Sequence, residues 1–289
     1  MKCLCCNSNQ IIPQLISSRD YLECLHCGFV FSAKRVDNKL KSRVTDHYQN
    51  IDPHERVANS KRSFFKSTLN YLSSEIKGKE KSILDIGCGF GYFLEFASRN
   101  GWTTFGVDIV DDAVQSARER VGEKNIFHGS LRDAHYPDKY FNAVTAWDIL
   151  MIVDDPLQEL KECYRVLKQG GTIGIRVRNL VFQKLIYQIY LPLRKIAFRL
   201  GVRNPYVFHP YCFTSKSMYF LLRRIGFTRI RIVNSPLTKG DPYSYSGIAG
   251  LTTFLKTLVD LLTNVLFRMT GGRCILGPSL LIWAKKPQP

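Results

Sequence analysis

The glycine-rich stretch SILDIGCGFGYF, residues 82–93, is the feature that most constrains the fold of this chain. Its apolar start predicts a buried strand, and its glycines predict a tight turn into a helix. A dinucleotide-binding turn has the spacing G-x-G-x-x-G/A, whereas Gly87, Gly89 and Gly91 stand at alternate positions here. The carboxylate of Asp85, just before the turn, would repel a pyrophosphate and attract an ammonium or sulfonium group. The turn therefore favours an amino-acid-like or sulfonium ligand over a dinucleotide.

Strand and helix patterns alternate along the chain after residue 81. Strands are expected at 82–86, 103–108, 125–128, 141–146, 171–177, 227–233 and 279–285. Helices are expected at 61–76, 91–99, 111–121, 154–168 and 214–225. Asp154 should begin the fourth of these helices, Gly170-Gly171 should end it, and Thr214 should cap the fifth. This alternation predicts an α/β fold with a largely parallel sheet and helices on both faces.

The N-terminal cysteines have the spacing of a metal site. Cys3-x2-Cys6 and Cys24-x2-Cys27 are separated by 17 residues, and Gly28 follows the second pair. Two such pairs can present four thiolates tetrahedrally to Zn²⁺, which predicts a zinc ribbon at 1–33. The alternatives are a redox-active set of free thiols, or a site in which Cys5 competes with Cys6. The other cysteines are expected in the core: Cys88, Cys163, Cys212 and Cys274.

The number of cysteines and the distribution of charge limit the cellular location and the kinds of partner that this chain can have. The total of nine cysteines is odd, and no apolar run precedes them, which indicates a reducing, cytoplasmic location without a signal peptide. Residues 175–289 hold 18 basic residues and only two acidic ones, Asp241 and Asp260. Such a basic half indicates an anionic partner: nucleic acid, a membrane surface or a phosphorylated substrate.

Asp108 completes a recognisable set of motifs. It ends the second expected strand, 17 residues after Gly91, where an acid can accept hydrogen bonds from both hydroxyls of a ribose. With "ILDIGCGFG", "GVDI", "YFNAVTAWDIL" and "DDPLQELKECYRVLKQGG", residues 81–178 resemble class I S-adenosylmethionine-dependent methyltransferases. The resemblance implies a Rossmann-like seven-stranded sheet with its last strand antiparallel, and S-adenosylmethionine as methyl donor. It assigns the cofactor site to Asp85, Gly87, Cys88, Gly89, Gly91, Asp108, Ile109, Ser130, Leu131 and Asp148.

The chain departs from this family's pattern in two places. Many relatives carry an acid after the third strand to meet the adenine amino group, whereas Ser130 and Leu131 would do so here. Many also carry Glu-His after the fourth strand, and here that pair is Met151-Ile152. His209, which follows an inserted segment, is therefore our candidate for the general base; the alternative is a histidine that only orders its loop before Pro210.

Two long apolar segments, 180–200 and 248–268, interrupt the α/β pattern. Each has a broad apolar face beside basic residues, and Pro192 should kink the first. Neither offers the ~20 uninterrupted apolar residues that a membrane span needs. They are expected either to lie at an anionic membrane surface or to form a cap over the site or a homodimer interface. The domains are then a ribbon at 1–33, a linker and helix at 34–80, and a methyltransferase domain at 81–289 carrying both insertions.

The leading functional hypothesis is O-methylation of a sugar, glycan or lipid-linked acceptor, at the inner face of the membrane or in the cytoplasm. The ribbon resembles that of methyltransferases in surface-polysaccharide and sugar pathways, and the segment FHPYCFTSKSMYFLLRRIGF resembles quinone-pathway O-methyltransferases. An RNA methyltransferase is a second hypothesis, although the basic residues lie among apolar runs rather than exposed aromatics. A cofactor-binding scaffold without catalysis is a third.

Overall fold

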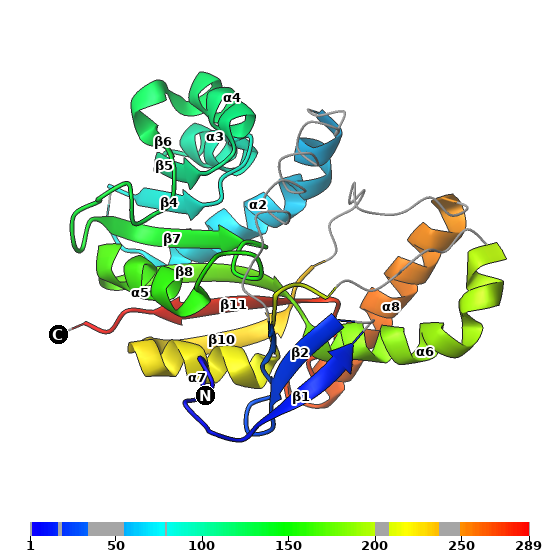
Figure 1. Ribbon diagram of the computed structural model, residues 1–289. Helices are drawn as coiled ribbons and strands as arrows, with labels where there is room; N and C mark the ends of the chain where they lie inside the picture. The colour runs from blue at the N-terminus through cyan, green and yellow to red at the C-terminus, as the bar shows by residue number, and fades with distance from the viewer. Residues whose placement is uncertain are drawn as a thin grey trace.

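The structure is a computed structural model, and it describes residues 2–16, 19–33, 55–78, 80–199, 208–236 and 249–288. Most of the expected linker, and the end residues 200 and 248 of the two insertions, lie outside this part of the chain. Within it the strands form a seven-stranded sheet and a four-stranded sheet. Figure 1 shows the larger sheet flanked by helices and the smaller one below it near the N-terminus.

The larger sheet has the strand order β10 (Thr228–Asn234), β11 (Ser279–Lys285), β8 (Leu167–Arg178), β7 (Phe141–Trp147), β4 (Ser82–Ile86), β5 (Thr103–Asp108) and β6 (Ile126–His128). The pairs from β8 through β6 are parallel, and β11 is antiparallel to both of its neighbours. The expected seven-stranded sheet with an antiparallel last strand is thus confirmed. The strand order reverses between β4 and β7, and ligands of such sheets bind at the carboxyl ends of strands at that point.

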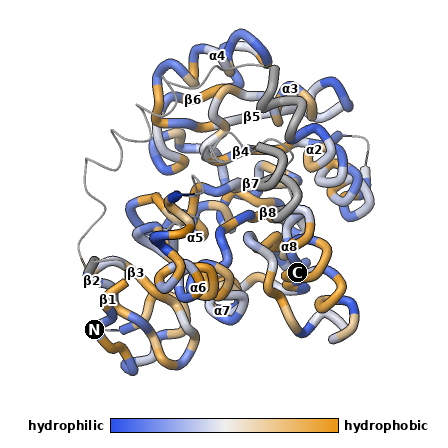
Figure 2. Tube along the Cα trace, turned by 90° about the vertical axis from the view of Figure 1, so that its right-hand side faces the viewer, coloured by the Kyte–Doolittle hydropathy of each residue, from blue (hydrophilic) through white to orange (hydrophobic). Residues whose placement is uncertain are grey.

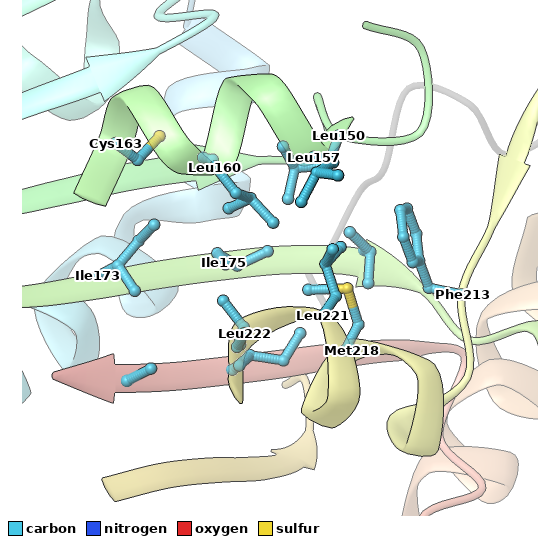
Figure 3. Packing of buried hydrophobic residues seen from close by; sticks show 14 of the residues in the cluster. Leu150, Leu157, Leu160, Cys163, Ile173, Ile175, Phe213, Met218, Leu221 and Leu222 are labelled. Carbon is cyan, nitrogen blue, oxygen red and sulfur yellow. The ribbon is translucent and has the colours of Figure 1, made fainter. Parts of the chain in front are cut away.

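Helices cover both faces of this sheet. One face packs against α2 (Glu55–Glu75), α3 (Tyr92–Arg99) and α4 (Asp111–Val121), and the other against α5 (Pro156–Val166) and α7 (Ser215–Ile225). Neighbouring side chains of β4 point to opposite faces of the sheet. Ile83 belongs to the apolar cluster under α2, α3 and α4, and Leu84 belongs to a second cluster under α5 and α7. Figure 3 shows the second cluster, where Leu160 of α5 and Leu222 of α7 approach Ile175 of β8.

Most expected elements are confirmed within a few residues, and three details differ. Asp155, not Asp154, caps α5, because its carboxylate accepts from the backbone N–H groups of Leu157 and Gln158. The helix ends at Val166 rather than near 168, since Leu167 already pairs with Phe141 of β7 and begins β8. Gly170 therefore lies inside a strand. Cys274 is only half-buried, whereas the other three cysteines expected in the core are buried.

The smaller sheet joins the N-terminus to a distant segment. Its strands are β1 (Ile11–Ile16), β2 (Arg19–Cys24), β3 (Val30–Ser32) and β9 (Tyr211–Cys212), in that order and antiparallel. The last pairing sets Val30 against Cys212 and Phe31 against Tyr211. The cysteine-rich module is thus extended by a strand from the chain that follows the first insertion.

The two apolar insertions form long helices, α6 (Leu180–Arg199) and α8 (Ala249–Met269). Pro192 lies inside α6, which changes direction along its length (Figure 1). In both views α6 and α8 lie on the same side of the molecule, away from α3 and α4 (Figures 1 and 2). Among the described helices, none combines the length and the apolarity that crossing a bilayer requires.

Candidate active site and zinc centre

The glycine turn links β4 to α3 at the switch point of the sheet. Gly87 and Gly91 have φ values of 67° and 79°, a region that favours glycine, and Gly91 is the N-cap of α3. A Cβ on Gly91 would lie 2.9 Å from the Cα of Ala117, so α4 packs too closely for any larger residue. The turn also bonds to β5, since the N–H groups of Gly87 and Cys88 both donate to the carbonyl of Val107. The turn is therefore a fixed backbone cradle.

Asp108, at the end of β5, fastens this cradle. One carboxylate oxygen accepts from the N–H of Gly89 at 2.8 Å, and the other from the N–H of Val110 at 3.0 Å. Burial raises the pKa of Asp108, and these backbone donors oppose the rise. Each oxygen keeps a further lone pair that a ligand hydroxyl can use. Beside it the side chain of Ile109 is 53% exposed, whereas that of Cys88 is buried.

Asp85, at the end of β4, is a buried carboxyl with little compensation. Its side chain is 2% exposed, and it accepts one hydrogen bond, of 2.6 Å, from the hydroxyl of Thr145 on β7. Burial raises its pKa to about 8; the bond from Thr145 opposes the rise, and the charge of Asp108 adds to it. A carboxyl in this state gains strongly from a cation placed beside it. This environment fits the cationic ligand that the sequence indicated.

Asp148 follows β7 and faces the same end of the sheet. It holds a left-handed backbone with φ of 60°, an uncommon conformation for a residue with a side chain. Its N–H donates to the carbonyl of Arg176 on β8 at 2.9 Å, and the guanidinium of Arg176 forms an ion pair with its carboxylate. Burial opposes ionisation, but Arg176 outweighs it and holds the pKa of Asp148 below its usual range. Asp148 is thus held in place and ionised at the edge of the site.

Three residues near Asp148 were not singled out from the sequence as site residues. Arg176 lies 4.9 Å from the ring centroid of Phe64 on α2, which adds a cation–π contact. Lys61, one turn earlier on α2, lowers the pKa of both Asp85 and Asp148 through its charge. A charged residue in the middle of the apolar strand TIGIRVRN could have pointed to Arg176. The contribution of α2 depends on how that helix docks, and a sequence pattern does not give this.

Ser130 and Leu131 lie beyond β6, next to Asp108, where Gly129 donates to the carbonyl of Asp108 at 2.8 Å. Leu131 is fully buried. The hydroxyl of Ser130 donates to the carboxylate of Asp133 at 2.6 Å, so its proton is already engaged. The backbone N–H of Ser130 donates to the same carboxylate at 3.2 Å, so contact with an adenine amino group would use the oxygen atoms of Ser130 as acceptors; this role stays a prediction.

The segment that carries His209 is anchored beside the loop after β7. Tyr211 donates from its N–H to the carbonyl of Met151 and from its hydroxyl to the carbonyl of Asp154, at 3.3 and 2.8 Å. Met151 is buried, so this replacement of the relatives' polar pair serves packing. His209 itself is half-buried, and its carbonyl accepts from the thiol of Cys212. Its role as a base stays a prediction.

Four N-terminal cysteines converge as their spacing predicted. The sulfur atoms of Cys3, Cys6, Cys24 and Cys27 all lie within 4.8 Å of one another, with pairs at 3.6 and 3.5 Å. Tetrahedral Zn²⁺ with bonds of about 2.3 Å needs sulfurs about 3.8 Å apart. The geometry thus suits zinc.

Two matching turns explain why Cys6 rather than Cys5 belongs to the set. Asn7 and Gly28 each follow the second cysteine of a pair, with φ of 64° and 70°, and each donates its N–H to the carbonyl of the first cysteine. Cys5 is fully buried and its thiol interacts with those of Cys3 and Cys27, but it lies outside this repeated turn. The Asn7–Gly28 correspondence is visible in the sequence and could have resolved the choice.

Comparison with known proteins shows what this chain is similar to. Residues 84–175 match the family described as a methyltransferase domain. Relatives named ubiquinone biosynthesis O-methyltransferase include one from Alkalilimnicola ehrlichii, 34% identical over 38% of this chain and 47% of its own length. Another, from Nitrosomonas europaea, is 30% identical over 42% of this chain and 54% of its own length. The chain thus spans about half the length of the curated relatives that it matches.

Solved structures support the fold. A plantazolicin methyltransferase, solved with a monoazolic desmethylPZN analogue and S-adenosylhomocysteine, has a TM-score of 0.54 and 20% identity over 87% of this chain and 91% of its own. An S-adenosylmethionine-dependent methyltransferase from Methanosarcina mazei has a TM-score of 0.50 and 20% identity over 76% of this chain and 98% of its own. At these identities the likeness concerns the fold alone. The expected class I methyltransferase fold is confirmed.

Proposed function

We propose that this chain, in which residues 84–175 form a methyltransferase domain, is an S-adenosylmethionine-dependent methyltransferase. The observation that carries the proposal is the buried carboxyl of Asp85 at the switch point, with its pKa raised to about 8 by burial. A carboxyl left in that state favours a ligand that brings positive charge. Asp108, beside it, keeps lone pairs for hydroxyl groups, and the two acids thus fit the amino-acid end and the ribose of a nucleoside joined to an amino acid.

The residues present fit this cofactor. Asp85 and the turn Gly87–Gly91 would hold its amino-acid end, Asp108 its ribose, and Ile109, Ser130 and Leu131 its adenine; Asp148 would close the site. When bound, S-adenosylmethionine supplies a methyl group on a positively charged sulfur. The chain then has to align the acceptor atom in line with that methyl and keep water out, and alignment supplies most of the rate. His209 would take the proton from an acceptor hydroxyl on its neutral imidazole nitrogen.

Binding of S-adenosylmethionine by calorimetry tests the proposal. Asp108→Ala should weaken binding by about 1–3 kcal/mol, the cost of leaving ligand hydroxyls without charged partners. Glu119→Ala removes an exposed acid of α4 and serves as the matched control, with binding unchanged. Equal affinities in the two variants would remove Asp108 from the cofactor site, and failure of the unaltered chain to bind would overturn the proposed function.

The proposed acceptor is a hydroxyl group on a sugar, glycan or lipid-linked molecule. A second candidate, the hydroxyl of a quinone precursor, is favoured by the relatives named for ubiquinone biosynthesis. Methyl transfer from labelled cofactor to each acceptor class separates the two. Methyl transfer to RNA would instead support the RNA methyltransferase hypothesis. Absence of transfer to every acceptor class would support the hypothesis of a non-catalytic scaffold.

The cysteine set is proposed to bind one structural Zn²⁺ through Cys3, Cys6, Cys24 and Cys27. When bound, the ion would tie the two turns of the ribbon together. The ribbon in turn contacts the acceptor side, because the hydroxyl of Thr214 donates to the carbonyl of Cys27 at 2.9 Å and β3 pairs with β9. We therefore assign the metal a supporting role for the segment that carries His209.

A further inference from the structure

The outer part of α6 is exposed all round. Leu180 and Gln183, in its first turn, are buried, but from 188 to 199 every side chain is exposed or half-exposed. Large apolar residues are among them: Ile196 is 58% exposed and Phe198 is 59% exposed. A soluble helix normally turns such residues toward a core. Several of them together on one projecting helix indicate an interaction surface.

α8 adds a second apolar surface on the same side of the molecule. Leu261 and Leu262 are each 59% exposed and Met269 is 80% exposed. In Figure 2 both α6 and α8 are largely orange, whereas α4, whose outer face meets solvent, is mostly blue and white. The exposed parts of these two helices, 188–199 and 257–269, are here termed the α6–α8 surface.

The charges on this surface are almost all positive. α6 contains no acidic residue, and Arg194, Lys195 and Arg199 are exposed around a shallow hollow that Tyr190 and Phe198 complete. α8 contributes exposed Arg268 near its end. Its acidic residue in this range, Asp260, is half-buried, and burial raises its pKa, which weakens any negative charge there. Lys184, nearer the sheet, is already paired with Glu23 of the ribbon at 2.7 Å.

We propose that the α6–α8 surface docks this protein onto an anionic lipid bilayer. Exposed apolar side chains interleaved with cations suit a helix that lies in the interface, its apolar groups among acyl chains and its cations among anionic headgroups. A second copy of the chain fits less well, because it would set one cationic helix against another with few acids to compensate. The proposal does not depend on the chemistry of the active site.

The placement also has a consequence for the acceptor. α6 starts directly after β8, and the N–H of Leu180 donates to the carbonyl of Phe213 at 2.9 Å, next to the segment that carries His209. A membrane held at α6 would therefore lie on the acceptor side of the sheet rather than on the side of α3 and α4. This arrangement suits an acceptor drawn from the bilayer.

Sedimentation with vesicles tests the docking. The full chain should bind vesicles containing phosphatidylglycerol more tightly than vesicles of phosphatidylcholine alone, and added salt should weaken that preference. Arg194→Glu with Lys195→Glu should weaken binding to anionic vesicles by at least about fivefold for each position, or at least about 25-fold together, because each change removes a cation and adds a repelled anion. Leu193→Asn with Ile196→Asn should weaken binding to both kinds of vesicle, because it removes apolar contact.

A matched control uses the same charge change elsewhere. Lys77→Glu with Lys124→Glu alters two exposed lysines near the α2 and α4 ends, and should leave vesicle binding nearly unchanged. An equal loss of vesicle binding in the control pair would show that only the net charge of the protein matters, and would overturn the proposal. Equal binding of the unaltered chain to both vesicle types would also overturn the proposal. A third contrary result would be a chain that binds no vesicles but forms a homodimer in solution, which Leu193→Asn with Ile196→Asn dissociates. Retained S-adenosylmethionine binding in every variant separates this result from failure of the proposed function.

Discussion

The raised pKa of Asp85 gives a stability effect whose sign is unusual for an acid. In the unfolded chain an Asp ionises near pH ~3.9, whereas in the fold Asp85 holds its proton to about pH 8. Between these values the folded state binds more protons than the unfolded state, so the contribution of Asp85 to stability falls as pH rises. We expect Asp85→Asn to gain stability relative to the unaltered, cofactor-free chain from about pH 4 to about pH 8, by at most about 1.4 kcal/mol per pH unit.

Denaturant unfolding of both proteins near pH ~5 and near pH ~8 measures this difference. Asp148→Asn is the control of opposite sign. Burial opposes the charge of Asp148, but Arg176 keeps its pKa low, so its contribution is present at neutral pH and is lost as pH falls. A stability gap between Asp85→Asn and the unaltered chain that did not change with pH would contradict the buried, protonated state of Asp85.

His209 is the residue for which chemistry and structure can be separated most directly. His209→Ala keeps the carbonyl that accepts from Cys212, so the local backbone should persist. With the true acceptor, we expect turnover to fall roughly 10²–10⁴-fold while S-adenosylmethionine affinity stays unchanged. The loss should be smaller at high pH, where a hydroxyl acceptor ionises without help. Near-normal turnover would show that positioning alone drives the reaction.

At the scale of elements, the paired cysteine turns lead to a metal prediction. Purified chain should contain one zinc, Cys24→Ser should lose it, and Cys5→Ser should retain it, because Cys5 lies outside the matched turns of Asn7 and Gly28. Metal analysis of these three proteins and of Cys6→Ser decides this. If Cys5→Ser lost zinc and Cys6→Ser kept it, the fourth ligand would be Cys5 instead of Cys6. Absence of zinc from every protein would favour the redox-active alternative.

The elements of the sheet were predictable because each has a local signal. Apolar runs, the glycines at 87–91 and the cap at Thr214 all depend on nearby residues, and these elements lie where expected within a few positions. The pairing of β3 with β9 was not predictable, since it joins residues about 180 positions apart through two short strands. The ion pair of Asp148 with Arg176 was missed for a similar reason: it depends on β7 and β8 being neighbours in register.

At the scale of the whole molecule, the N-terminal cysteine-rich module and the larger sheet share one core. Cys3, Cys27 and Phe29 belong to the same buried cluster as Leu84 of β4 and Met218 of α7. Arg224 of α7 also donates to the carbonyl of Leu4 at 2.6 Å. A module integrated in this way should not unfold by itself, and loss of its metal should be felt by the rest of the fold.

Intrinsic fluorescence can test this coupling, because Trp102, Trp147 and Trp283 all lie in or beside the larger sheet and none in the ribbon. If zinc binds only the folded state, a chelator removes stabilisation from the whole cooperative unit. We therefore expect chelation to lower the melting temperature seen by tryptophan fluorescence, by about 2–4 °C for each kcal/mol lost. Cys24→Ser, which lacks a ligand, should already melt early and should not respond to the chelator. A tryptophan transition that ignores the chelator in zinc-loaded protein would show that the ribbon unfolds independently, and would remove the basis for its support of the His209 segment.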